Sequence, residues 1–492
     1  MKLLFTDSPA GALQPLADAL AKSHSVTTRC LREGEPVDWP SLLRGVDAVI
    51  HGAGFDLPSE AGAIAQAGFD AYSLGKALAA SPTQRVIVLS RLEIHDAYDP
   101  RYLIDETWRP QPRPIAGELG PFIIESILRE FARTGETRGL TLRLRKAELT
   151  DNPADACRAI EAALAVDFTP HGYRWHVCHV SRVPRFLTFE AKQLLGLDLR
   201  KEKEWPDETD YHSKQKPPEP AGGVQPGGRV VVIGAGGGVG CALWNRLRSE
   251  YELVLADRNG LAEARTVSAS WAQAELPASM KWTHVDVTDL NSVRAAVRGA
   301  GAVINLTVVR NEVPGAFAVN LGGACNVSRA CAEAGVRRLI HTGPWARVNG
   351  FEGDYRYAYD ITEGAPYAAG TRPYPHTKSM SALVARSFAE SEGLETFTYW
   401  ISRIRPADAL DGRDNDVFIP FSVSWEDLAE AFACGLRAPS TGHWYEEFFI
   451  GASSPQEKVH FDKARHFLGW SASDDFRQFY TRPPRSRPQE KD

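Results

Sequence analysis

The chain contains two separate beginnings of the same kind. Residues 2–5 (KLLF) and 229–233 (RVVVI) each form an apolar strand pattern, and each leads through a turn of small residues into an amphipathic helix pattern, at 13–22 and 239–249. Strand, turn and helix in this order open a βαβ unit. Two α/β domains are therefore expected, and the length of 492 residues agrees, since single cores seldom grow beyond roughly 250–300 residues.

Further similarities follow in the same order in both halves. Three pairs of segments correspond: 45–51 (GVDAVIH) with 299–305 (GAGAVIN), 85–89 (RVIVL) with 338–341 (RLIH), and 192–197 (KQLLGL) with 463–470 (KARHFLGW). We infer that one α/β unit has been duplicated. The predicted fold class is α/β, with two tandem Rossmann-like doubly wound parallel-sheet domains, each carrying a small C-terminal substrate-binding subdomain.

Composition places the domain boundaries. Residues 1–199 are predicted to form the first domain and residues 228–480 the second. Between them, residues 200–227 are dense in charge, proline and glycine and are expected to be an exposed linker. Residues 481–492 are expected to be a polar tail.

Composition also excludes several classes of function. Apolar residues make up 43% of the chain, yet no window approaches the roughly 18–20 apolar residues of a membrane span, so no membrane partner is expected. A net charge of −6 gives no reason to expect nucleic acid. The first residues do not show the pattern of a secretory signal, so none is expected, and the seven cysteines lack Cys-x-x-Cys spacing. We therefore expect a cytoplasmic protein with reduced thiols and a small-molecule substrate.

A glycine-rich turn, 234–240 (GAGGGVG), follows the second strand pattern. Its glycines allow a tight turn, a close approach of the backbone to a pyrophosphate, and close packing of the helix on the sheet. The helix N-terminus adds N–H donors and a positive dipole end for the phosphates. We therefore assign dinucleotide binding to Gly234, Gly237, Gly238, Val239 and Gly240.

The residues after the next strand pattern bear on the choice of cofactor. Asp257 lies about 20 residues after the glycines, where a carboxylate accepts hydrogen bonds from the adenosine ribose and repels a 2′-phosphate. NAD is therefore favoured over NADP. Arg258 follows directly and could bind a 2′-phosphate instead, so NADP stays the alternative.

Tyr374 and Lys378 form a Tyr-x-x-x-Lys motif within 372–379 (RPYPHTKS). Spacing of four on a helix puts both side chains on one face, so the ammonium can lower the pKa of the phenol from roughly 10 toward working pH. The phenolate can then take a proton from a substrate hydroxyl while hydride passes to nicotinamide. A surface Tyr beside a surface Lys is the less favoured interpretation, because the pair follows a dinucleotide-binding pattern.

These motifs, in this order, resemble the extended short-chain dehydrogenase/reductase family, also described as NAD-dependent epimerases and dehydratases. The resemblance covers nearly all of residues 228–475, and its further markers are Asp286-Val287, Asn305-Leu306-Thr307, Asn320 and Arg405-Pro406. It implies that Asp286, Val287, Leu306 and Pro406 contact the cofactor and that Lys378 also binds the nicotinamide ribose.

The third catalytic residue departs from the family pattern. Members of the family carry a Ser or Thr after the fifth strand that donates a hydrogen bond to the reacting oxygen. Here the segment 341–345 reads HTGPW, and an ungapped alignment puts Pro344, which has no hydroxyl, at that place. Thr342 is the candidate replacement if the loop is remodelled. No acid pair follows Thr342, which disfavours sugar-nucleotide dehydration.

The first half lacks the residues for the same chemistry. Asp7 stands at the place of the first glycine, where a carboxylate would oppose a pyrophosphate, and Ile115 and Leu119 stand where Tyr and Lys are expected. We predict that this degenerate copy keeps the fold and serves packing, dimerisation or substrate enclosure, with a homodimer as one assembly. The His176-Val177-Cys178-His179 run alternates between the faces of a strand, so no metal site is expected.

The sequence predicts an NAD-dependent oxidoreductase or epimerase that acts on a secondary alcohol of a sugar or nucleotide-sugar. Two alternatives stay open. One is an oxidoreductase similar to 3β-hydroxysteroid dehydrogenases, acting on a hydrophobic alcohol. The other is a sensor or scaffold that holds NAD without turnover, which Pro344 and the degenerate first copy favour.

Overall fold

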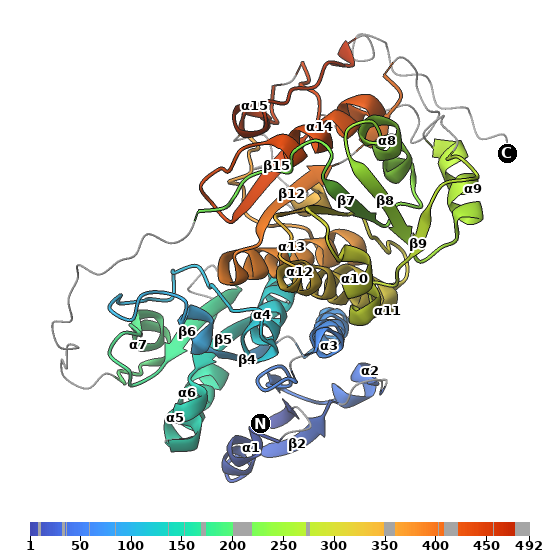
Figure 1. The fold of residues 1–492 in the computed structure, drawn as a ribbon. Helices are drawn as coiled ribbons and strands as arrows, with labels where there is room; N and C mark the ends of the chain where they lie inside the picture. Colours follow the sequence, from blue (N-terminus) through green and yellow to red (C-terminus); the bar gives the residue numbers. More distant parts are fainter. Residues whose placement is uncertain are drawn as a thin grey trace. The chain divides into compact units, whose positions relative to one another are not determined.

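The computed structural model describes residues 1–7, 11–31, 35, 37–58, 60–83, 85–135, 137–151, 153–168, 174–199, 219–271, 276–348, 360–401, 403–407, 422–455 and 457–477. The chain divides into two compact units. One unit is Met1–Pro217 with Val313–Gly322, and the other is Pro218–Glu312 with Gly323–Asp492. Each unit contains a parallel β-sheet with its own helices (Figure 1).

The first unit is built on a six-stranded sheet with the order β2-β1-β3-β4-β5-β6. Its strands are β1 Lys2–Asp7, β2 Ser25–Cys30, β3 Ala48–His51, β4 Arg85–Arg91, β5 Arg138–Leu144 and β6 Trp175–Val180. Its helices are α1 Gln14–Leu20, α2 Trp39–Leu42, α3 Ala61–Ala79, α4 Ala116–Thr134, α5 Lys146–Asp151, α6 Pro153–Ala165 and α7 Phe189–Leu195, with a 3₁₀ turn at Leu92–His95. All the strand pairs in this sheet are parallel.

The second unit is built on a seven-stranded sheet with the order β15-β12-β11-β10-β7-β8-β9. Its strands are β7 Arg229–Ile233, β8 Glu252–Asp257, β9 Trp282–His284, β10 Ala302–Asn305, β11 Arg338–Pro344, β12 Glu395–Ile401 and β15 Tyr445–Ile450, with β13 Arg403–Arg405 and β14 Ser422–Ser424 paired separately. Its helices are α8 Gly238–Leu247, α9 Leu261–Trp271, α10 Leu290–Val297, α12 Gly323–Glu333, α13 Pro373–Glu392, α14 Trp425–Arg437 and α15 Asp462–Leu468, with a 3₁₀ turn at Trp345–Val348.

The strand orders confirm the predicted fold class of two Rossmann-like parallel sheets. In the second sheet the order reverses between β7 and β10, which is the switch point of a doubly wound fold. The six strands of the first sheet follow the same order as six of these seven, and β9 has no counterpart among them. The helices α10, α12 and α13 pack on one face of the second sheet, and α8 and α14 pack on the other (Figure 1). The small substrate-binding subdomains stay a prediction.

Apolar strand residues form the core of each unit. Phe5 and Ile50 are fully buried in the first sheet, and Val232 and Ile304 are fully buried in the second. Parallel strands covered by helices on both faces need such nearly continuous apolar runs. Polar residues therefore gather where the strands end, and this carboxyl edge is where ligands bind in open α/β sheets.

One segment of the second half of the sequence belongs to the first unit. It comprises α11, Val313–Gly315, and a π-helical segment, Ala316–Gly322. The ring of Phe317 lies 5.3 Å from that of Tyr72 in α3, centroid to centroid, and both side chains are buried. The predicted domains place this segment within 228–480, because a sequence pattern does not show that Phe317 packs on distant aromatic rings.

The predicted linker lies partly outside the described residues. Of residues 200–227, the structure describes 219–227, where Pro220 and residues 222–224 are buried and the other residues are exposed. The Val224 side chain is buried in its core, and the Val224 N–H donates to the Leu436 carbonyl at 2.7 Å. The predicted tail, 481–492, lies outside the described residues. None of the helices in the described ranges combines the length and apolar character that crossing a bilayer requires.

Candidate active site

The glycine turn between β7 and α8 holds a geometry that side chains would disturb. Gly234 has a φ of +81°, and a Cβ atom there would lie 2.7 Å from the Thr307 nitrogen. A Cβ atom at Gly240 would overlap the Ala235 carbonyl oxygen. At Gly237, directly before α8, a Cβ atom would meet nothing within 4 Å. Gly234 and Gly240 are therefore tightly packed, whereas space is open at Gly237 before the N-terminus of α8. An open helix N-terminus suits a phosphate group.

Asp257 lies beside this turn at the end of β8. Its Oδ2 accepts a hydrogen bond from the Gly236 N–H at 2.8 Å, and its Oδ1 accepts one from the Asn259 N–H at 3.0 Å. These bonds fix the carboxylate next to the glycines. Each carboxylate oxygen has a second lone pair, which stays available for a ribose hydroxyl. Arg258, the alternative 2′-phosphate ligand, has an exposed side chain.

Asp286 and Val287 follow β9 and lie near the same edge. Burial raises the pKa of Asp286, but hydrogen bonds from Thr288 and the charge of Arg258 outweigh it and lower the pKa overall. Val287 is buried, and its side chain lies where a Cβ atom at Gly323 in α12 would be, so α12 approaches closely. The pair is thus held in place by the fold.

Two further expected cofactor contacts flank the site. The Leu306 N–H donates to the Ile233 carbonyl at 2.8 Å, so the backbone of Leu306 continues the pairing of β10 with β7 next to the glycine turn. Pro406 follows β13 and is half-buried. The structure therefore brings Leu306 to the glycines, and the cofactor roles of both residues stay predictions.

Tyr374 and Lys378 lie on the first turns of α13, which begins at Pro373. Tyr374 is half-buried, whereas Lys378 is buried and its Nζ donates to the Thr307 carbonyl at 3.3 Å. Burial, and to a lesser degree the charge of Arg310, lower the pKa of Lys378 to about 7. This amine therefore changes its charge near neutral pH.

The cation in contact with the Tyr374 ring is Arg310, which the sequence did not single out. Its guanidinium carbon lies 5.3 Å from the ring centroid, and the guanidinium hydrogen-bonds the phenol. Burial raises the pKa of the Tyr374 phenol, and Arg310 offsets part of that rise through its charge and this hydrogen bond. No motif marks Arg310, because it lies in the loop after β10.

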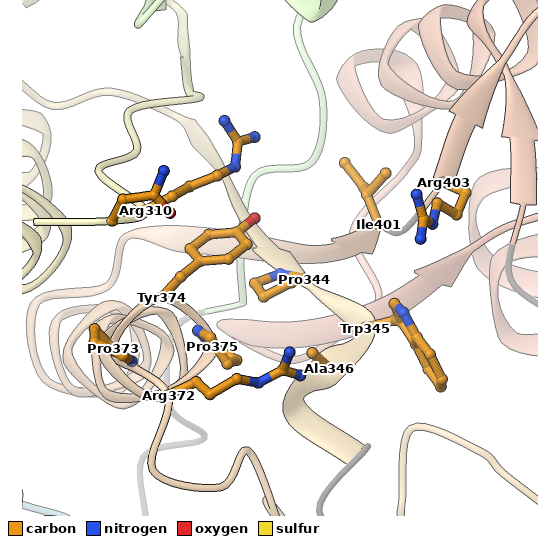
Figure 2. A pocket seen from close by; sticks show the side chains of 11 residues that line it. Arg310, Pro344, Trp345, Ala346, Arg372, Pro373, Tyr374, Pro375, Ile401 and Arg403 are labelled. Carbon is orange, nitrogen blue, oxygen red and sulfur yellow. The ribbon is translucent and has the colours of Figure 1, made fainter. Parts of the chain in front are cut away.

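Tyr374 opens into a cavity of about 670 Å³ (Figure 2), a volume typical of small-molecule sites. Of the eleven described residues that line it, three are arginines and none is acidic; the arginines are Arg310, Arg372 and Arg403. They come from the loop after β10, from the residue before α13, and from β13. The cavity therefore presents a phenol and a concentration of positive charge to a ligand.

The glycine turn, the acid at the end of β8 and the Tyr-x-x-x-Lys helix meet at one edge of a doubly wound sheet. Residues 230–403 match the NAD dependent epimerase/dehydratase family. This stretch of the chain is thus similar to NAD-dependent oxidoreductases and epimerases of the short-chain dehydrogenase/reductase type.

Individual relatives cover about half of this chain or less. An NAD-dependent glucose-6-phosphate dehydrogenase from Haloferax volcanii is 24% identical over 268 residues, which is 51% of this chain and 95% of the relative. An uncharacterized protein of Mycobacterium tuberculosis is 32% identical over 114 residues, which is 23% of this chain and only 12% of that protein.

Similar solved structures include the uronate dehydrogenase from Agrobacterium tumefaciens, with 22% identity, 53% of this chain and 91% of that chain covered, and a TM-score of 0.42. The dTDP-glucose 4,6-dehydratase from Streptomyces venezuelae has 17% identity, covers 50% of this chain and 92% of that chain, and has a TM-score of 0.37.

The structure also places the two residues considered for the third catalytic position, Pro344 and Thr342. Pro344 lines the cavity. The Thr342 hydroxyl donates to the Asn305 carbonyl at 2.9 Å, and Thr342 is not among the described residues that line the cavity. In this arrangement the hydroxyl proton of Thr342 is already engaged in a hydrogen bond within the sheet. The predicted donor role of Thr342 is therefore left without support from the geometry.

A buried hydrogen-bonded chain lies behind the catalytic helix. Ser381 donates to the Lys378 carbonyl at 2.8 Å and therefore accepts from His341 Nε2 at 2.9 Å. Burial, and then the charge of Lys378, hold the pKa of His341 well below its usual value. The neutral imidazole thus ties β11 to α13, the helix that carries Tyr374.

In the first unit, the residues at the positions of the first glycine, the Tyr and the Lys have structural roles. The Asp7 carboxylate is buried and accepts a hydrogen bond from the Leu13 N–H at 3.1 Å, so it binds the chain's own backbone before α1. Ile115 is exposed at the start of α4, and Leu119 is fully buried. Neither side chain can carry a proton, as expected from the residue types.

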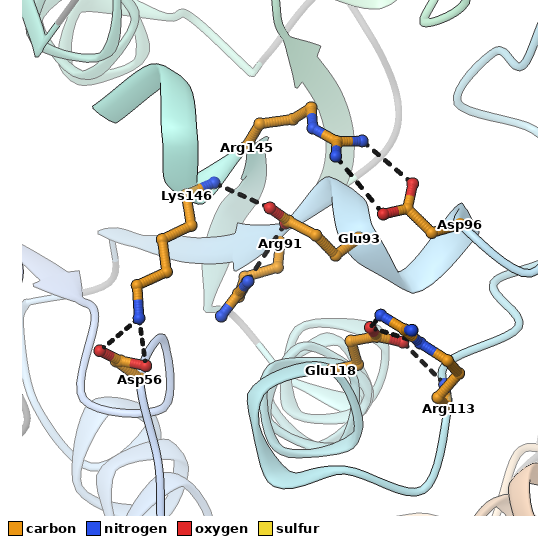
Figure 3. Close-up of polar contacts among 8 residues, drawn as sticks. All are labelled: Asp56, Arg91, Glu93, Asp96, Arg113, Glu118, Arg145 and Lys146. Carbon is orange, nitrogen blue, oxygen red and sulfur yellow. Dashed lines mark hydrogen bonds and ion pairs between the residues drawn. The ribbon is translucent and has the colours of Figure 1, made fainter. Parts of the chain in front are cut away.

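Ion pairs occupy the carboxyl edge of the first sheet (Figure 3). Each of four cations has an acid partner: Lys146 with Asp56 at 2.8 Å, Arg145 with Asp96 at 3.0 Å, Arg91 with Glu93 at 3.2 Å, and Arg113 with Glu118. This balance contrasts with the cavity beside Tyr374, where no acid is present among the described lining residues.

The His176-Cys178-His179 run lies on β6, as the strand pattern predicts. The His179 Nδ1 donates to the Leu187 carbonyl at 3.1 Å, and His176 lies 3.7 Å from Glu190. Within the described ranges, no group of three or more His, Cys, Asp or Glu side chains is arranged to hold a metal ion.

Proposed function

We propose that the second half of the chain catalyses NAD-dependent hydride transfer at a secondary alcohol of a sugar or nucleotide-sugar, as a dehydrogenase or an epimerase. Tyr374 is the acid/base that exchanges a proton with the substrate hydroxyl. The observation that carries this proposal is the position of its phenol in a cavity lined by three arginines and no described acid. Bound NAD supplies the nicotinamide ring that accepts the hydride.

The residues of the carboxyl edge fit this cofactor. Gly237 leaves open space at the N-terminus of α8 for the pyrophosphate, and Asp257 is held where a ribose hydroxyl would meet it. A fixed carboxylate there disfavours the 2′-phosphate of NADP, so NAD is the proposed cofactor. Lys378 lies close to the Thr307 backbone and is proposed to bind the nicotinamide ribose.

The charge of the cavity favours a sugar over a hydrophobic alcohol. Arginine binds carboxylate and phosphate groups through parallel N–H donors, and a guanidinium gains little from an uncharged steroid-like ligand. The relative from Haloferax volcanii is named for a phosphorylated sugar. We therefore propose a substrate that carries an anionic group, with Arg372 and Arg403 as its ligands.

The first half is proposed to be a copy of the same fold without the reaction. The Asp7 carboxylate accepts a hydrogen bond from the backbone of its own turn, and ion pairs occupy the carboxyl edge of the sheet. A ligand phosphate would have to displace such pairs and approach a buried carboxylate. Packing, dimerisation or substrate enclosure remain the proposed roles of this half.

The test is to incubate the full chain with NAD and three groups of alcohols, namely anionic sugars, neutral sugars and hydrophobic alcohols, and to follow absorbance of the reduced cofactor. Turnover restricted to anionic sugars, lost in Tyr374→Phe and kept in Tyr102→Phe, is the expected result. Tyr102 is exposed in the first unit and serves as the matched control. Tight NAD uptake with no reaction in any group would favour the sensor, the alternative to which Pro344 points.

A further inference from the structure

We propose that Arg310 is the hydrogen-bond donor to the reacting oxygen atoms, in the place for which Pro344 has no hydroxyl. This inference rests on the proposed function, since it assumes that Tyr374 reacts with a ligand in this cavity. It assigns to a guanidinium in the loop after β10 the part that a Ser or Thr after the fifth strand would otherwise take.

The position of Arg310 carries the inference. Its guanidinium carbon lies 5.3 Å from the centroid of the Tyr374 ring, and the guanidinium hydrogen-bonds the phenol. Figure 2 shows the side chain running alongside the ring with its guanidinium toward the hydroxyl end. Arg310, Tyr374 and Pro344 all line the same cavity. The donor, the acid/base and the position without a hydroxyl are thus neighbours.

The Arg310 guanidinium has further N–H donors besides those near the phenol. Arginine carries five N–H groups, more than a hydrogen bond to one phenol oxygen requires. Within the described ranges, no carboxylate lies at ion-pair distance from Arg310, in contrast with the paired arginines at the edge of the first sheet. The remaining N–H groups are therefore available to a substrate oxygen that approaches Tyr374.

Lys378 is less suited to this part. Its Nζ is buried and donates to the Thr307 carbonyl, and its pKa of about 7 leaves only part of the population charged at neutral pH. A guanidinium stays protonated throughout the working range of pH. Arg310 is therefore the permanent positive charge at the phenol, and it stabilises the phenolate form.

The substrate hydroxyl gives its proton to the Tyr374 phenolate, the carbon–hydrogen bond breaks, and its hydrogen leaves with both electrons to nicotinamide while the carbon–oxygen double bond forms. The alcohol is oxidised by two electrons and NAD⁺ is reduced to NADH. The phenol later releases its proton to water. Arg310 transfers no proton; its N–H groups stabilise negative charge on the two oxygens.

Three variants of the full chain test the inference: Arg310→Gln, Arg310→Lys and, as matched control, Arg372→Gln. Arg372 lines the same cavity, and its loss removes the same charge. The readout is the titration of Tyr374, observed by NMR of tyrosine labelled with carbon-13 and assigned by the signal lost in Tyr374→Phe. The pH profile of kcat/KM is measured in parallel, and thermal melting checks that each variant is folded.

Arg310→Gln is expected to raise the Tyr374 midpoint by about one pH unit and to lower kcat by about 10²–10³-fold, the cost typical of losing one such donor. Arg310→Lys should restore part of both. Arg372→Gln should change KM and leave the midpoint in place. An unchanged midpoint in Arg310→Gln overturns the inference. A shifted midpoint in a protein without turnover would support the action of Arg310 on the phenol and count against the proposed reaction instead.

Discussion

Arg338 and Glu395 form an ion pair with neither side chain exposed, and their nearest nitrogen and oxygen are 2.6 Å apart. They face each other across β11 and β12 as register partners. The guanidinium also donates to the carbonyls of Gly435 and Ala438, each at 2.7 Å, and so binds the end of α14 to the sheet. Burial lowers the pKa of Arg338 and raises that of Glu395, and each partner opposes the shift of the other.

Removing one partner of this pair should be costly. Arg338→Met would leave a buried carboxylate without its partner, which typically costs about 3–5 kcal/mol of unfolding free energy. The double variant Arg338→Met with Glu395→Gln should recover part of the loss. Urea unfolding measures both. The exposed pair Arg294–Glu333 is the control, and Arg294→Met should cost at most about 1 kcal/mol. Equal losses at the two sites would contradict this account.

Two glycines of the same turn should respond differently to alanine. At Gly240 the new Cβ would overlap the Ala235 carbonyl, so Gly240→Ala should lower the unfolding free energy by about 1–3 kcal/mol. At Gly237 nothing lies within 4 Å of the new atom, so Gly237→Ala should melt like the wild type. If a pyrophosphate occupies that space, Gly237→Ala should still weaken NAD binding. Thermal melting measures the stability of each variant, and calorimetric titration of the folded variant with NAD measures its affinity for the cofactor. Tight NAD binding by a stable Gly237→Ala protein would contradict the phosphate site.

Stability should fall as the solution becomes acidic. Burial lowers the pKa of His51 to about 4, of His179 to about 3, and of His95 to about 2. The unfolded chain takes up these protons below about pH 6.5 and the folded chain does not, so each histidine removes up to about 1.4 kcal/mol per pH unit below that point. Burial raises the pKa of Asp70 to about 6, which has the opposite sign, since its folded form gains a proton first.

Unfolding free energies measured between pH 7 and pH 5 check these signs. His95→Gln should flatten the decline by about one proton, whereas Asp70→Asn should steepen it, because it removes the opposing group. These slopes are independent of how much each variant loses in absolute stability. A steeper decline in His95→Gln would show that this imidazole is charged in the folded protein.

NAD should bind once per chain. The Asp7 carboxylate is buried and accepts a hydrogen bond from the Leu13 N–H, so a pyrophosphate at this turn of the first unit would meet a negative charge. Calorimetry on the full chain should give a stoichiometry of one. Gly237→Glu should abolish the uptake, because a carboxylate there opposes the pyrophosphate, whereas Asp7→Asn should leave it unchanged. A second site, or uptake that survives Gly237→Glu, would mean that the first unit binds the cofactor.

Local sequence patterns sufficed for much of the fold. The apolar run 229–233 is the strand β7 as observed, and the helix expected at 239–249 spans Gly238–Leu247. Both follow from side-chain periodicity and from glycines that permit only a few backbone conformations. The π-helical segment around Phe317 shows the limit, because its packing partner Tyr72 is distant in the sequence.

The site was predictable to a lesser degree. The spacing of Tyr374 and Lys378 placed both on one helix, as the structure has them. It also predicted that the ammonium would act on the phenol, whereas the Lys378 Nζ donates to the Thr307 carbonyl and the cation at the ring is Arg310. A helical spacing fixes which face a side chain leaves from. The spacing does not determine which loop places a charged side chain beside that face.

The assignment of Val313–Gly322 to the first unit means that the polypeptide passes between the units three times. A protease cut at the junction after Pro217 would therefore not yield two self-sufficient fragments. The C-terminal fragment would expose Phe317 and Leu321 to solvent, although both side chains are buried in the intact protein. Splitting the chain into two polypeptides at that junction would expose the same two side chains.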